Sequence, residues 1–290
     1  MQPIYPLKRQ VRISVAIPAS FTSDIPHLRE KTLRIGLVGR ALAIFRVDEV
    51  LIYPDILNRN QTRDADLIKM ILSYMETPQY LRKRLFKIRP ELRYVGILPP
   101  LRTPHHPTKN KEKKLKIGEC REGVVISSGK KGVYIDIGVE RPLLAPGVRM
   151  KVNSRVTVTI KEKGRELIGE ITNPDRVKFY WGYRVKKSSS PLGSILKNRE
   201  YDLVIATSRR GEPVMKVIDR LLNRWKRSSK VLIAFGSPTQ GLQEIIKQEN
   251  IRLEDVAHFI INTIPDQGVE TVRTEEAIYA TLAVLNILAP

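Results

Sequence analysis

Short apolar runs and helical stripes alternate along the N-terminal part of the chain. Residues 11–17 alternate apolar with mostly small or polar side chains, residues 49–53 form a second apolar run, and a proline ends each, which is typical of strands. Residues 26–43 predict a helix, and Thr62 can cap another. The second helix has apolar residues on one face: Leu67, Ile68, Ile71, Leu72 and Met75. This alternation predicts an α/β layer.

The pattern changes in the middle of the chain. Residues 98–107 contain too many prolines for a regular element, and a basic linker follows them. Between Gly118 and Ile171 the helical period disappears. Short β-type runs separated by glycine-containing turns replace it, at residues 123–126, 133–137, 156–160 and 166–171. We expect a small antiparallel β-barrel here, of the oligonucleotide-binding type.

Strand and helix alternate again after Pro174. Residues 202–206 predict a strand. The helix after it has one apolar face: Val214, Val217, Ile218, Leu221, Leu222 and Trp225. A chain of 290 residues can form two domains. The prediction is therefore one discontinuous α/β domain, residues 1–100 and 175–290 with a largely parallel sheet, interrupted by a barrel at residues 110–172.

The last segment, residues 277–288, is apolar almost all round. A helix of this kind must be buried on every side, either by its own domain or by a second subunit. Thr274 is a candidate N-cap, and Glu275 and Glu276 would lie favourably in the first turn.

Two loops near the C-terminus are candidates for ligand binding. Each follows a short apolar run and is rich in Gly and Pro: residues 236–242 and residues 262–273. In α/β sheets, ligands bind beyond the carboxyl ends of the strands. Residues 237–240 also fit a capping box with proline at the first helical position, which is at least a well-formed helix start and, as a functional reading, presents free backbone N–H groups to a ligand.

Charge directs the search toward nucleic acid. Lys and Arg number 51 against 30 Asp and Glu, a net charge of +21 that is spread along the chain. A basic surface attracts polyanions, so RNA or DNA is the first partner to consider, with solubility as the plainer explanation.

Several other classes are excluded. Cys120 is the only cysteine, so no internal disulfide or multi-thiolate metal site can form. His105 and His106 adjoin a loop without a carboxylate cluster, so we expect no metal there, but an RNA-facing or structural loop. The sequence shows no G-x-G-x-x-G fingerprint and no serine with plausible triad partners. With no apolar run approaching a membrane span, we expect a cytoplasmic protein.

Three motifs in this order resemble one family. Phe235-Gly236-x-x-x-x-Gly241-Leu242 is followed by Ile264-Pro265-x-x-Gly268 with Thr271-Val272-Arg273 and a helix. These residues resemble the second and third motifs of the trefoil-knotted, S-adenosylmethionine-dependent RNA methyltransferases called the SPOUT class. The run Gly36-x-x-x-Arg40-x-x-x-x-Phe45-x-Val47-Asp48 resembles the first motif of the ribose-methylating branch.

The inserted barrel narrows this resemblance. Together with residues 101–107 and 180–183, it is similar to an archaeal and eukaryotic SPOUT subgroup with an oligonucleotide-binding-type insertion, and the resemblance covers nearly the whole chain. It implies a knotted fold, S-adenosylmethionine as cofactor, RNA as substrate and a homodimer with the active site at the subunit interface. It also implies that Arg40 contacts RNA and helps to activate the nucleophile, and we add Arg273 as a second catalytic candidate; the alternative for each is an ordinary salt bridge.

The resemblance implies a cofactor held mainly by the backbone of three loops, where small residues let the chain come close. The predicted cofactor-binding residues are Ala206, Thr207, Ser208, Phe235, Gly236, Ser237, Pro238, Gly241, Ile261, Asn262, Thr263, Ile264, Pro265, Gln267, Gly268, Thr271 and Val272. The predicted RNA-binding residues are Arg102, His105, His106, Lys130, Lys131, Arg141, Arg155 and Lys161, with scattered solvated charges as the alternative for those of the barrel.

The departures from the ribose-methylating pattern indicate a different target atom. That branch carries Asn, Glu and Ser-Leu-Asn where this chain has Arg34, Pro238 and Thr271-Val272-Arg273. We therefore expect methylation of a base nitrogen, and the family points to a uridine of large-subunit ribosomal RNA. The alternative function is a non-catalytic RNA-binding or ribosome-assembly protein on the same fold. A metabolic enzyme conflicts with the charge.

Overall fold

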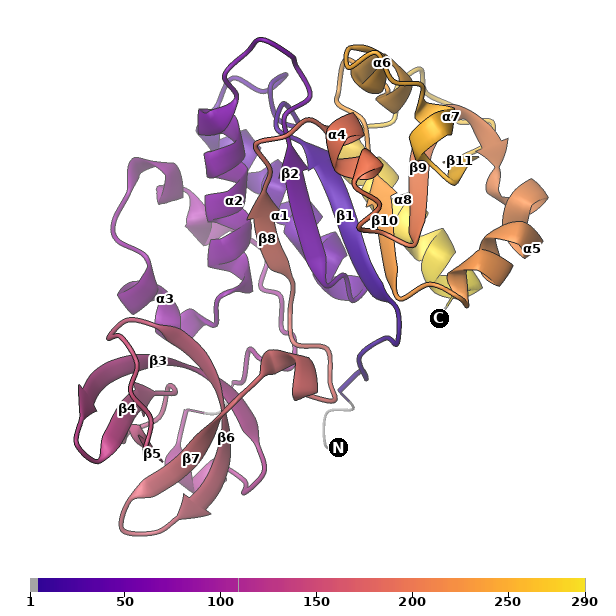
Figure 1. The fold of residues 1–290 in the computed structure, drawn as a ribbon. Coiled ribbons are helices and arrows are strands. Elements are labelled where there is room, and N and C mark those ends of the chain that lie inside the picture. Colours follow the sequence, from indigo (N-terminus) through magenta and orange to yellow (C-terminus); the bar gives the residue numbers. More distant parts are fainter. Residues whose placement is uncertain (1–4, 109, 290) are drawn as a thin grey trace. The chain divides into compact units, whose positions relative to one another are not determined.

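The computed structural model describes residues 5–108 and 110–289 (Figure 1). The chain divides into two compact units. One, here called the barrel unit, comprises Glu76–Arg89, Leu101–Gly182 and the N-terminal residues up to Lys8. The other, the sheet unit, comprises Arg9–Met75, Pro90–Pro100 and the chain from Tyr183 onward. Compared with the predicted boundaries, the barrel unit includes three segments of the part we had assigned to the α/β domain: the N-terminal one, Glu76–Arg89 and residues 175–182.

A parallel sheet forms the centre of the sheet unit. Its six strands have the order β11-β9-β10-β1-β2-β8, and every neighbouring pair is parallel. The strands are β1 (Arg12–Pro18), β2 (Glu49–Tyr53), β8 (Arg184–Lys187), β9 (Leu203–Pro213), β10 (Lys230–Ala234) and β11 (Phe259–Asn262). Because both faces are covered, the central strands consist almost entirely of apolar residues rather than alternating with polar ones.

Helices cover both faces of the sheet (Figure 1). They are α1 (Leu28–Ile44), α2 (Thr62–Glu76), α4 (Leu192–Lys197), α5 (Val214–Trp225), α6 (Leu242–Lys247), α7 (Leu253–Val256) and α8 (Thr274–Leu288), with short 3-10 turns at Pro90–Leu92 and Val95–Ile97. One buried cluster joins Ala16, Ala206 and Ala234 to the apolar faces of α4, α6 and α7. Helix α1 packs against α8.

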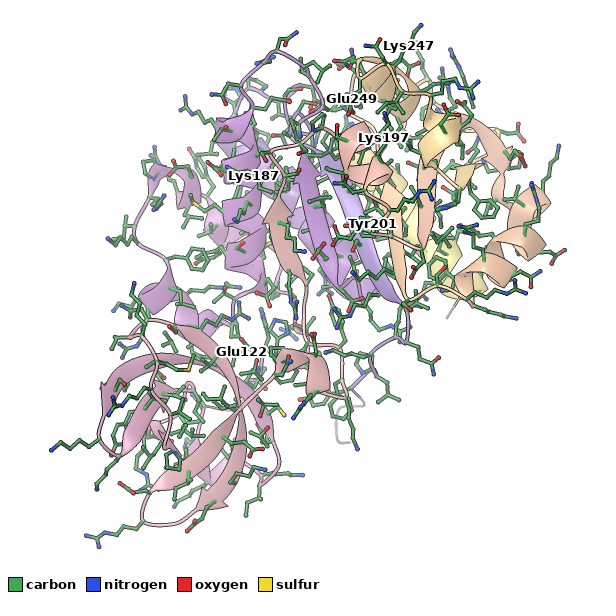
Figure 2. All side chains as sticks on the ribbon, in the orientation of Figure 1. Glu122, Lys187, Lys197, Tyr201, Lys247 and Glu249 are labelled. Atoms are coloured by element: carbon green, nitrogen blue, oxygen red, sulfur yellow. The ribbon has the colours of Figure 1, made fainter. Side chains whose placement is uncertain are left out.

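A carboxylate fixes the start of α4. Glu249, labelled in Figure 2, accepts hydrogen bonds from the backbone N–H groups of Gly193 at 2.7 Å and Ser194 at 2.8 Å. These are donors of the first helical turn, which have no partner inside the helix. A side chain from beyond α6 therefore caps a short helix that has Pro191 at its own cap position.

The barrel unit contains a closed five-stranded barrel in the order β3-β4-β5-β7-β6. Its elements are α3 (Gln79–Leu85), β3 (Cys120–Gly129), β4 (Gly132–Asp136), β5 (Leu143–Pro146), β6 (Arg155–Lys163) and β7 (Leu167–Thr172), with 3-10 turns at Glu112–Lys114 and Pro174–Arg176. The prediction of an entirely antiparallel barrel was wrong at one pair, because β5 runs parallel to β7. Strand β5 was missed because Pro142 and Pro146 flank its short apolar run.

The broad fold prediction, a parallel α/β sheet with an inserted β-barrel, is confirmed. Two local predictions were wrong. Residues 237–240 do not start a helix: Ser237 and Gln240 close a turn by a backbone hydrogen bond of 2.9 Å, and α6 begins only at Leu242. Thr274 is not the cap of α8 but its first residue, after Arg273. Nor is α8 buried all round within this chain, since 78% of Ile287 is exposed.

Candidate functional site

A cavity of about 320 Å³ lies at the carboxyl edge of the sheet, where β9, β10 and β11 end. Three loops and the first turns of α6 and α8 line it. The lining residues are Thr207, Ser208, Arg209, Arg210, Phe235, Gly236, Ser237, Pro238, Thr239, Gln240, Gly241, Gln243, Glu244, Ile261, Asn262, Thr263, Ile264, Gln267, Glu270, Thr271, Val272, Thr274, Ala277 and Thr281. Parallel sheets commonly bind their ligands at this edge.

A shift in register between β9 and β11 produces the first loop. Ile260 pairs with Ala206, but the next residue, Ile261, pairs with Glu212. The β9 residues between these two partners, 207–211, are therefore displaced from the ladder into the cavity. Asn262 holds them there, because its side-chain amide donates to the carbonyl oxygen of Arg209 at 2.9 Å. A Cβ on Gly211 would lie 2.7 Å from the backbone of Ile261, so only glycine permits this approach.

The loop after β10 folds tightly on itself. The Ser237 hydroxyl accepts a hydrogen bond from the backbone N–H of Gln240 at 3.0 Å. A Cβ on Gly236 would lie 2.8 Å from the carbonyl oxygen of Gln240, which is closer than real side chains come. The absence of a side chain at Gly236 therefore permits the turn that forms one wall of the cavity.

A buried tyrosine anchors the base of that loop. The Tyr53 hydroxyl donates to the carbonyl oxygen of Phe235 at 2.6 Å, and the N–H of Phe235 donates to Ala16 at 3.0 Å. Burial raises the pKa of Tyr53 well above its ordinary value, followed by the effect of nearby Asp55. The phenol therefore stays protonated and remains a donor.

Helix α8 closes the cavity on its remaining side. Its first residue, Thr274, donates through its hydroxyl to the carbonyl oxygen of Gly236 at 3.2 Å. Two turns later, the hydroxyls of Thr281 and Thr263 lie 2.8 Å apart. Two threonines of α8 thus connect the second and third loops.

The chemistry of the lining suits binding more than acid–base catalysis. It consists mainly of hydroxyls, amides and backbone groups, and its charged side chains are Arg209, Arg210, Glu244 and Glu270. Arg209 donates to the carbonyl oxygen of Glu270 at 2.6 Å, which joins the first loop to the third. Such a site can hold a ligand by its polar edges and exclude water from one side of it.

Comparison with known proteins identifies the family. The sequence model of the family described as "Putative RNA methyltransferase" matches residues 12–285. The chain belongs to this family. It is 33% identical to an uncharacterized protein of Halobacterium salinarum over 94% of this chain and 98% of that one. It is 30% identical to the 28S rRNA (uridine-N(3))-methyltransferase of Mus musculus over 96% of this chain and 77% of that protein. For the Drosophila melanogaster protein with the same name, the identity is 31% over 94% of this chain and 61% of that protein.

The predicted RNA methyltransferase function is thereby confirmed at the level of the family. The structure brings the predicted cofactor-binding residues together around the cavity, except Ala206, Pro265 and Gly268. Ala206 is buried in the sheet, and Pro265 and Gly268 are exposed on the third loop. Whether these residues bind a cofactor stays a prediction.

Some lining residues were missed by the sequence analysis. They are Arg209, Arg210, Thr239, Gln240, Gln243, Glu244, Glu270, Thr274, Ala277 and Thr281. A polar run directly after the buried strand of β9 was the available signal for Arg209 and Arg210. The register shift that turns this run inward has no local signature, because it depends on a pairing with residues more than fifty positions away.

The two predicted catalytic arginines do not line the cavity of the same chain. Arg40 lies on α1, and its guanidinium donates to the carbonyl oxygen of Pro100 at 2.9 Å. It also lies near Tyr279 of α8, whose pKa is raised by burial and lowered in part by the Arg40 charge. Arg273 is exposed at the cap of α8, and its backbone N–H donates to Glu276 at 2.9 Å. Arg40 and Arg273 remain predictions of function.

Arg34, one of the departures from the ribose-methylating pattern, connects α1 to α8. Its guanidinium lies 2.7 Å from Asp24 and 3.2 Å from Glu275. Glu275 is only 5% exposed, and burial raises its pKa. The arginine therefore supports the helix that closes the cavity.

A buried charge network lies in the barrel unit. Arg155 donates to Glu76 at 2.6 Å and to Glu122 at 2.6 Å, and Trp181 donates to Glu122 at 2.6 Å. Glu122 is labelled in Figure 2. Burial alone would raise the pKa of Glu76, but Arg155 and a hydrogen bond from His105 outweigh it and lower that pKa to about 2. The pair is thus fully ionised at neutral pH.

Two of the predicted RNA-binding residues belong to this network. His105 is fully buried, with its Nε2 atom 3.1 Å from the Glu76 carboxylate, so direct contact with RNA was a wrong prediction for this side chain. Arg155 has its donors committed to two carboxylates and acts as their counterion. His106 donates to the carbonyl oxygen of Glu76 at 2.7 Å, and burial lowers its pKa to about 3. The loop of residues 104–107 is therefore structural, the alternative left open above.

The remaining predicted RNA-binding residues are exposed. Lys130 and Lys131 form the turn between β3 and β4. Lys161 lies 2.7 Å from Glu170, and Arg141 donates to Glu112 at 2.7 Å, which lowers the pKa of Glu112. Arg102 is exposed in a left-handed conformation, at φ 53°. Exposed ion pairs are weak, so Lys161 and Arg141 can exchange their partners for phosphates.

Two searches of the described residues gave a negative result. Within residues 5–108 and 110–289, His, Cys, Asp and Glu side chains form no group of three or more that could hold a metal ion. In the same part of the chain, no helix has the length and apolar character needed to cross a membrane.

Proposed function

We propose that the chain transfers a methyl group from S-adenosylmethionine to the N3 atom of a uridine in large-subunit ribosomal RNA. The observation that supports this most is the cavity at the carboxyl edge of the sheet, in a chain whose relatives include proteins named 28S rRNA (uridine-N(3))-methyltransferase. Its volume is that of a small-molecule site.

The residues of the cavity fit this cofactor. Gly236, Gly241 and the backbone of residues 261–264 offer peptide groups at close range, where an adenine edge can find donors and acceptors. The carboxylates of Glu244 and Glu270 supply negative charge for the ammonium and sulfonium groups. When bound, S-adenosylmethionine supplies an activated methyl group, so the protein needs mainly to position the acceptor and to accommodate its proton.

The chemical step balances without a redox partner. When bound, S-adenosylmethionine would supply the methyl group and retain the electrons of its C–S bond, while the uridine N3 atom would give its proton to solvent water and its electron pair to the new N–C bond. Arg40 and Arg273 are the groups that we propose to hold the RNA in line and to stabilise the negative charge that develops on the uracil oxygens.

A homodimer would complete this site. On α1, the exposed side chains of Leu33, Leu37 and Ile44 recur at i, i+4 and i+11, one stripe of the helix, and Arg40 lies in the same stripe. An arginine within an apolar stripe is suited to an interface where it reaches a neighbouring subunit. We therefore propose that the stripe joins two copies. This is supported if sedimentation finds that the parent is a dimer and that the Leu37→Glu variant is a folded monomer. A parent that is monomeric at micromolar concentration would contradict it.

We also propose that the barrel binds RNA and that the C-terminal part of the chain is knotted. Numbered along the chain, the five barrel strands lie side by side in the order 1-2-3-5-4, and the third strand is parallel to the fifth. This arrangement is compatible with an oligonucleotide-binding barrel. Two observations support the knot: β11 pairs with β9 at the edge of the sheet, and α8, which follows β11, packs against α1. An experimental backbone trace in which residues 263–290 pass outside all preceding loops would exclude the knot. The cytoplasm remains the predicted location.

One experiment tests the function as a whole. The purified protein is incubated with methyl-labelled S-adenosylmethionine and an unmodified transcript of large-subunit ribosomal RNA, and the product is mapped by mass spectrometry of nucleosides. We expect 3-methyluridine at a single position. Methylation of a ribose oxygen would refute the base assignment. RNA binding without any methylated product, at saturating cofactor, would favour the non-catalytic assembly protein.

A further inference from the structure

A second cavity lies at the opposite edge of the same sheet. It measures about 580 Å³ and is lined by Asp202, Phe259 and, from α5 and the turn after it, Arg220, Arg224, Arg227 and their neighbours. Asp202 directly precedes β9, and Phe259 is the first residue of β11. The cavity is therefore at the amino ends of the strands whose carboxyl ends form the first cavity. The paired part of β9 between the two edges, residues 203–206, spans about 13 Å at ~3.3 Å per residue.

Helix α5 has a basic face that packing does not require. Its buried face consists of Val214, Val217, Leu221 and Trp225. On the other side, Lys216, Arg220, Arg224 and Arg227 recur at i, i+4, i+8 and i+11. Like charges at this spacing repel one another and destabilise a helix. The favourable field at a helix C-terminus explains a basic residue at Arg224 but not the full row.

The negative charges nearby are largely committed to other groups. The Asp202 carboxylate accepts the backbone N–H groups of Ser229 at 2.7 Å and Lys230 at 2.9 Å, and these bonds lower its pKa. Arg224 donates to the carbonyl oxygen of Asp202 at 3.2 Å rather than to a carboxylate. Arg220 lies 2.9 Å from Glu212, but both side chains are more than half exposed, so this pair is weak. The cavity thus presents positive charge to solvent.

An aromatic ring lies among these arginines. Phe259 lines the cavity at the start of the edge strand β11 and is only partly buried, so part of its ring is open to solvent. Partly exposed aromatic rings beside basic side chains are the platforms on which unpaired bases stack, while the cations neutralise the flanking phosphates.

We propose that this cavity, which we call the arginine cavity, binds a single-stranded segment of the RNA substrate. One base stacks on Phe259, and Arg220 and Arg227 contact the phosphates on either side of it. The inference deepens the proposed function, on which it rests, because it gives the RNA a second point of attachment on the same sheet as the methyl-transfer site. Arg224 keeps its contact with Asp202 and supports the cavity.

The test uses the full chain and a fluorescein-labelled single-stranded oligouridine, with 2-aminopurine at one position in a second probe. Arg220→Gln/Arg227→Gln removes the two phosphate contacts, and Phe259→Leu removes the ring but keeps an apolar side chain. The control Arg63→Gln/Arg252→Gln removes the same charge from exposed positions elsewhere on the sheet unit. We expect the first variant to bind about tenfold more weakly at 0.1 M salt and to reduce the slope of log affinity against log salt by about 1.4.

Phe259→Leu is expected to weaken binding about tenfold and to abolish the quenching of 2-aminopurine that stacking causes in the parent. A salt slope that falls equally in the control would overturn the proposal, since any surface charge would then serve. Unchanged quenching in Phe259→Leu would also overturn it. Competition by polyglutamate as strong as that by oligouridine would assign the cavity to an acidic protein instead.

Binding of S-adenosylmethionine, measured by calorimetry, separates this inference from the proposed function. We expect equal cofactor affinity in all three variants and the parent. A parent that binds no cofactor but shows the predicted losses of RNA affinity would leave the arginine cavity intact and refute the methyl-transfer proposal. If the parent methylates RNA and the variants bind RNA as tightly as the parent does, the methyl-transfer proposal stands and the arginine cavity is refuted.

Discussion

The carboxyl edge of the sheet and the interior of the barrel unit bring polar groups together in different ways. At the sheet edge, loops rich in glycine and hydroxyl side chains leave a cavity open to solvent. In the barrel unit, Glu76, Glu122, Arg155 and His105 are joined to one another by buried ion pairs and hydrogen bonds. The first arrangement is suited to a ligand that comes and goes, and the second to a fixed structure.

A strongly shifted pKa does not by itself identify the functional site of this protein. A pKa of about 2 for Glu76 and of about 3 for His106 would ordinarily draw attention to the barrel unit as a catalytic centre. Their hydrogen bonds, however, are directed at one another and at backbone groups. Structural networks perturb pKa values as strongly as active sites do, so geometry has to decide.

The largest effect is expected in the buried network. Arg155→Met leaves Glu76 and Glu122 without their counterion, and breaking a buried pair from one side costs about 3–5 kcal/mol. Arg141→Met removes an exposed pair with Glu112 from the same unit and should destabilise the protein far less. Urea unfolding followed by tryptophan fluorescence, in a Trp225→Phe background so that Trp181 alone reports on the barrel unit, measures both. Similar losses in the two variants would show that the network is not a structural core.

A large effect on the reaction is expected from α1. Arg40→Ala should lower the rate of methyl transfer at least about hundredfold, equivalent to ~2.7 kcal/mol, because it removes a cation proposed to stabilise developing charge. Cofactor affinity should stay nearly the same, since Arg40 lies outside the cavity of its own chain. Single-turnover kinetics and calorimetry measure these two quantities. Equal losses in both would assign Arg40 to the structure of the site.

Two glycines distinguish a cavity wall from a loop that merely lies near it. An added methyl group on Gly236 would meet the backbone of Gln240 at 2.8 Å, whereas a Cβ on Gly268 has no neighbour within 4 Å among the described residues. Gly236→Ala should therefore weaken cofactor binding about tenfold or more, ~1.4 kcal/mol, and Gly268→Ala should change it little. Calorimetric titration with S-adenosylmethionine compares them. Tenfold weaker binding in Gly268→Ala alone would contradict the prediction, because it would place the cofactor at Gly268 rather than at the wall formed by Gly236.

A further effect is a dependence of stability on mild acid. The folded-state pKa of His106 is depressed to about 3 by burial, so the unfolded chain binds a proton more readily, and stability falls as pH decreases below ~6.5. The depressed pKa of Glu76 has the same sign, with stability present above ~4.5 and lost as pH approaches 2. Each contributes at most ~1.4 kcal/mol per pH unit.

His106→Asn should remove the part of the pH dependence between 6.5 and 4.5. His27→Asn, at an exposed position, serves as the control and should leave the profile unchanged. Urea midpoints collected from pH 7.5 to pH 4.5 provide the measurement. A parent protein whose midpoint is constant over that range would contradict the prediction.

Much of the fold was predictable because its signals are local. Strands β1, β2, β10 and the start of β9 are buried and appear as largely apolar runs, and the long helices show apolar stripes such as that of α5. The loops 236–242 and 262–273 were found for the same reason, since glycine and proline after an apolar run mark a turn at a strand end. Strand β5 was not predicted because prolines flank its short apolar run, and the start of α6 was not predicted correctly because a tight turn precedes it.

Sequence alone determined the long helices and the apolar strands of the sheet, the insertion of a barrel, the basic character and the two loops at the sheet edge. Tertiary structure decided which polar residues face a ligand. Arg209 and Arg210 reach the cavity only because β9 slips past β11, and His105 is withdrawn from solvent only because Glu76 and Arg155 enclose it. The physical reason is that burial and charge pairing arise from contacts between residues far apart in the chain. These contacts cannot be predicted from the residues that neighbour each position in the sequence.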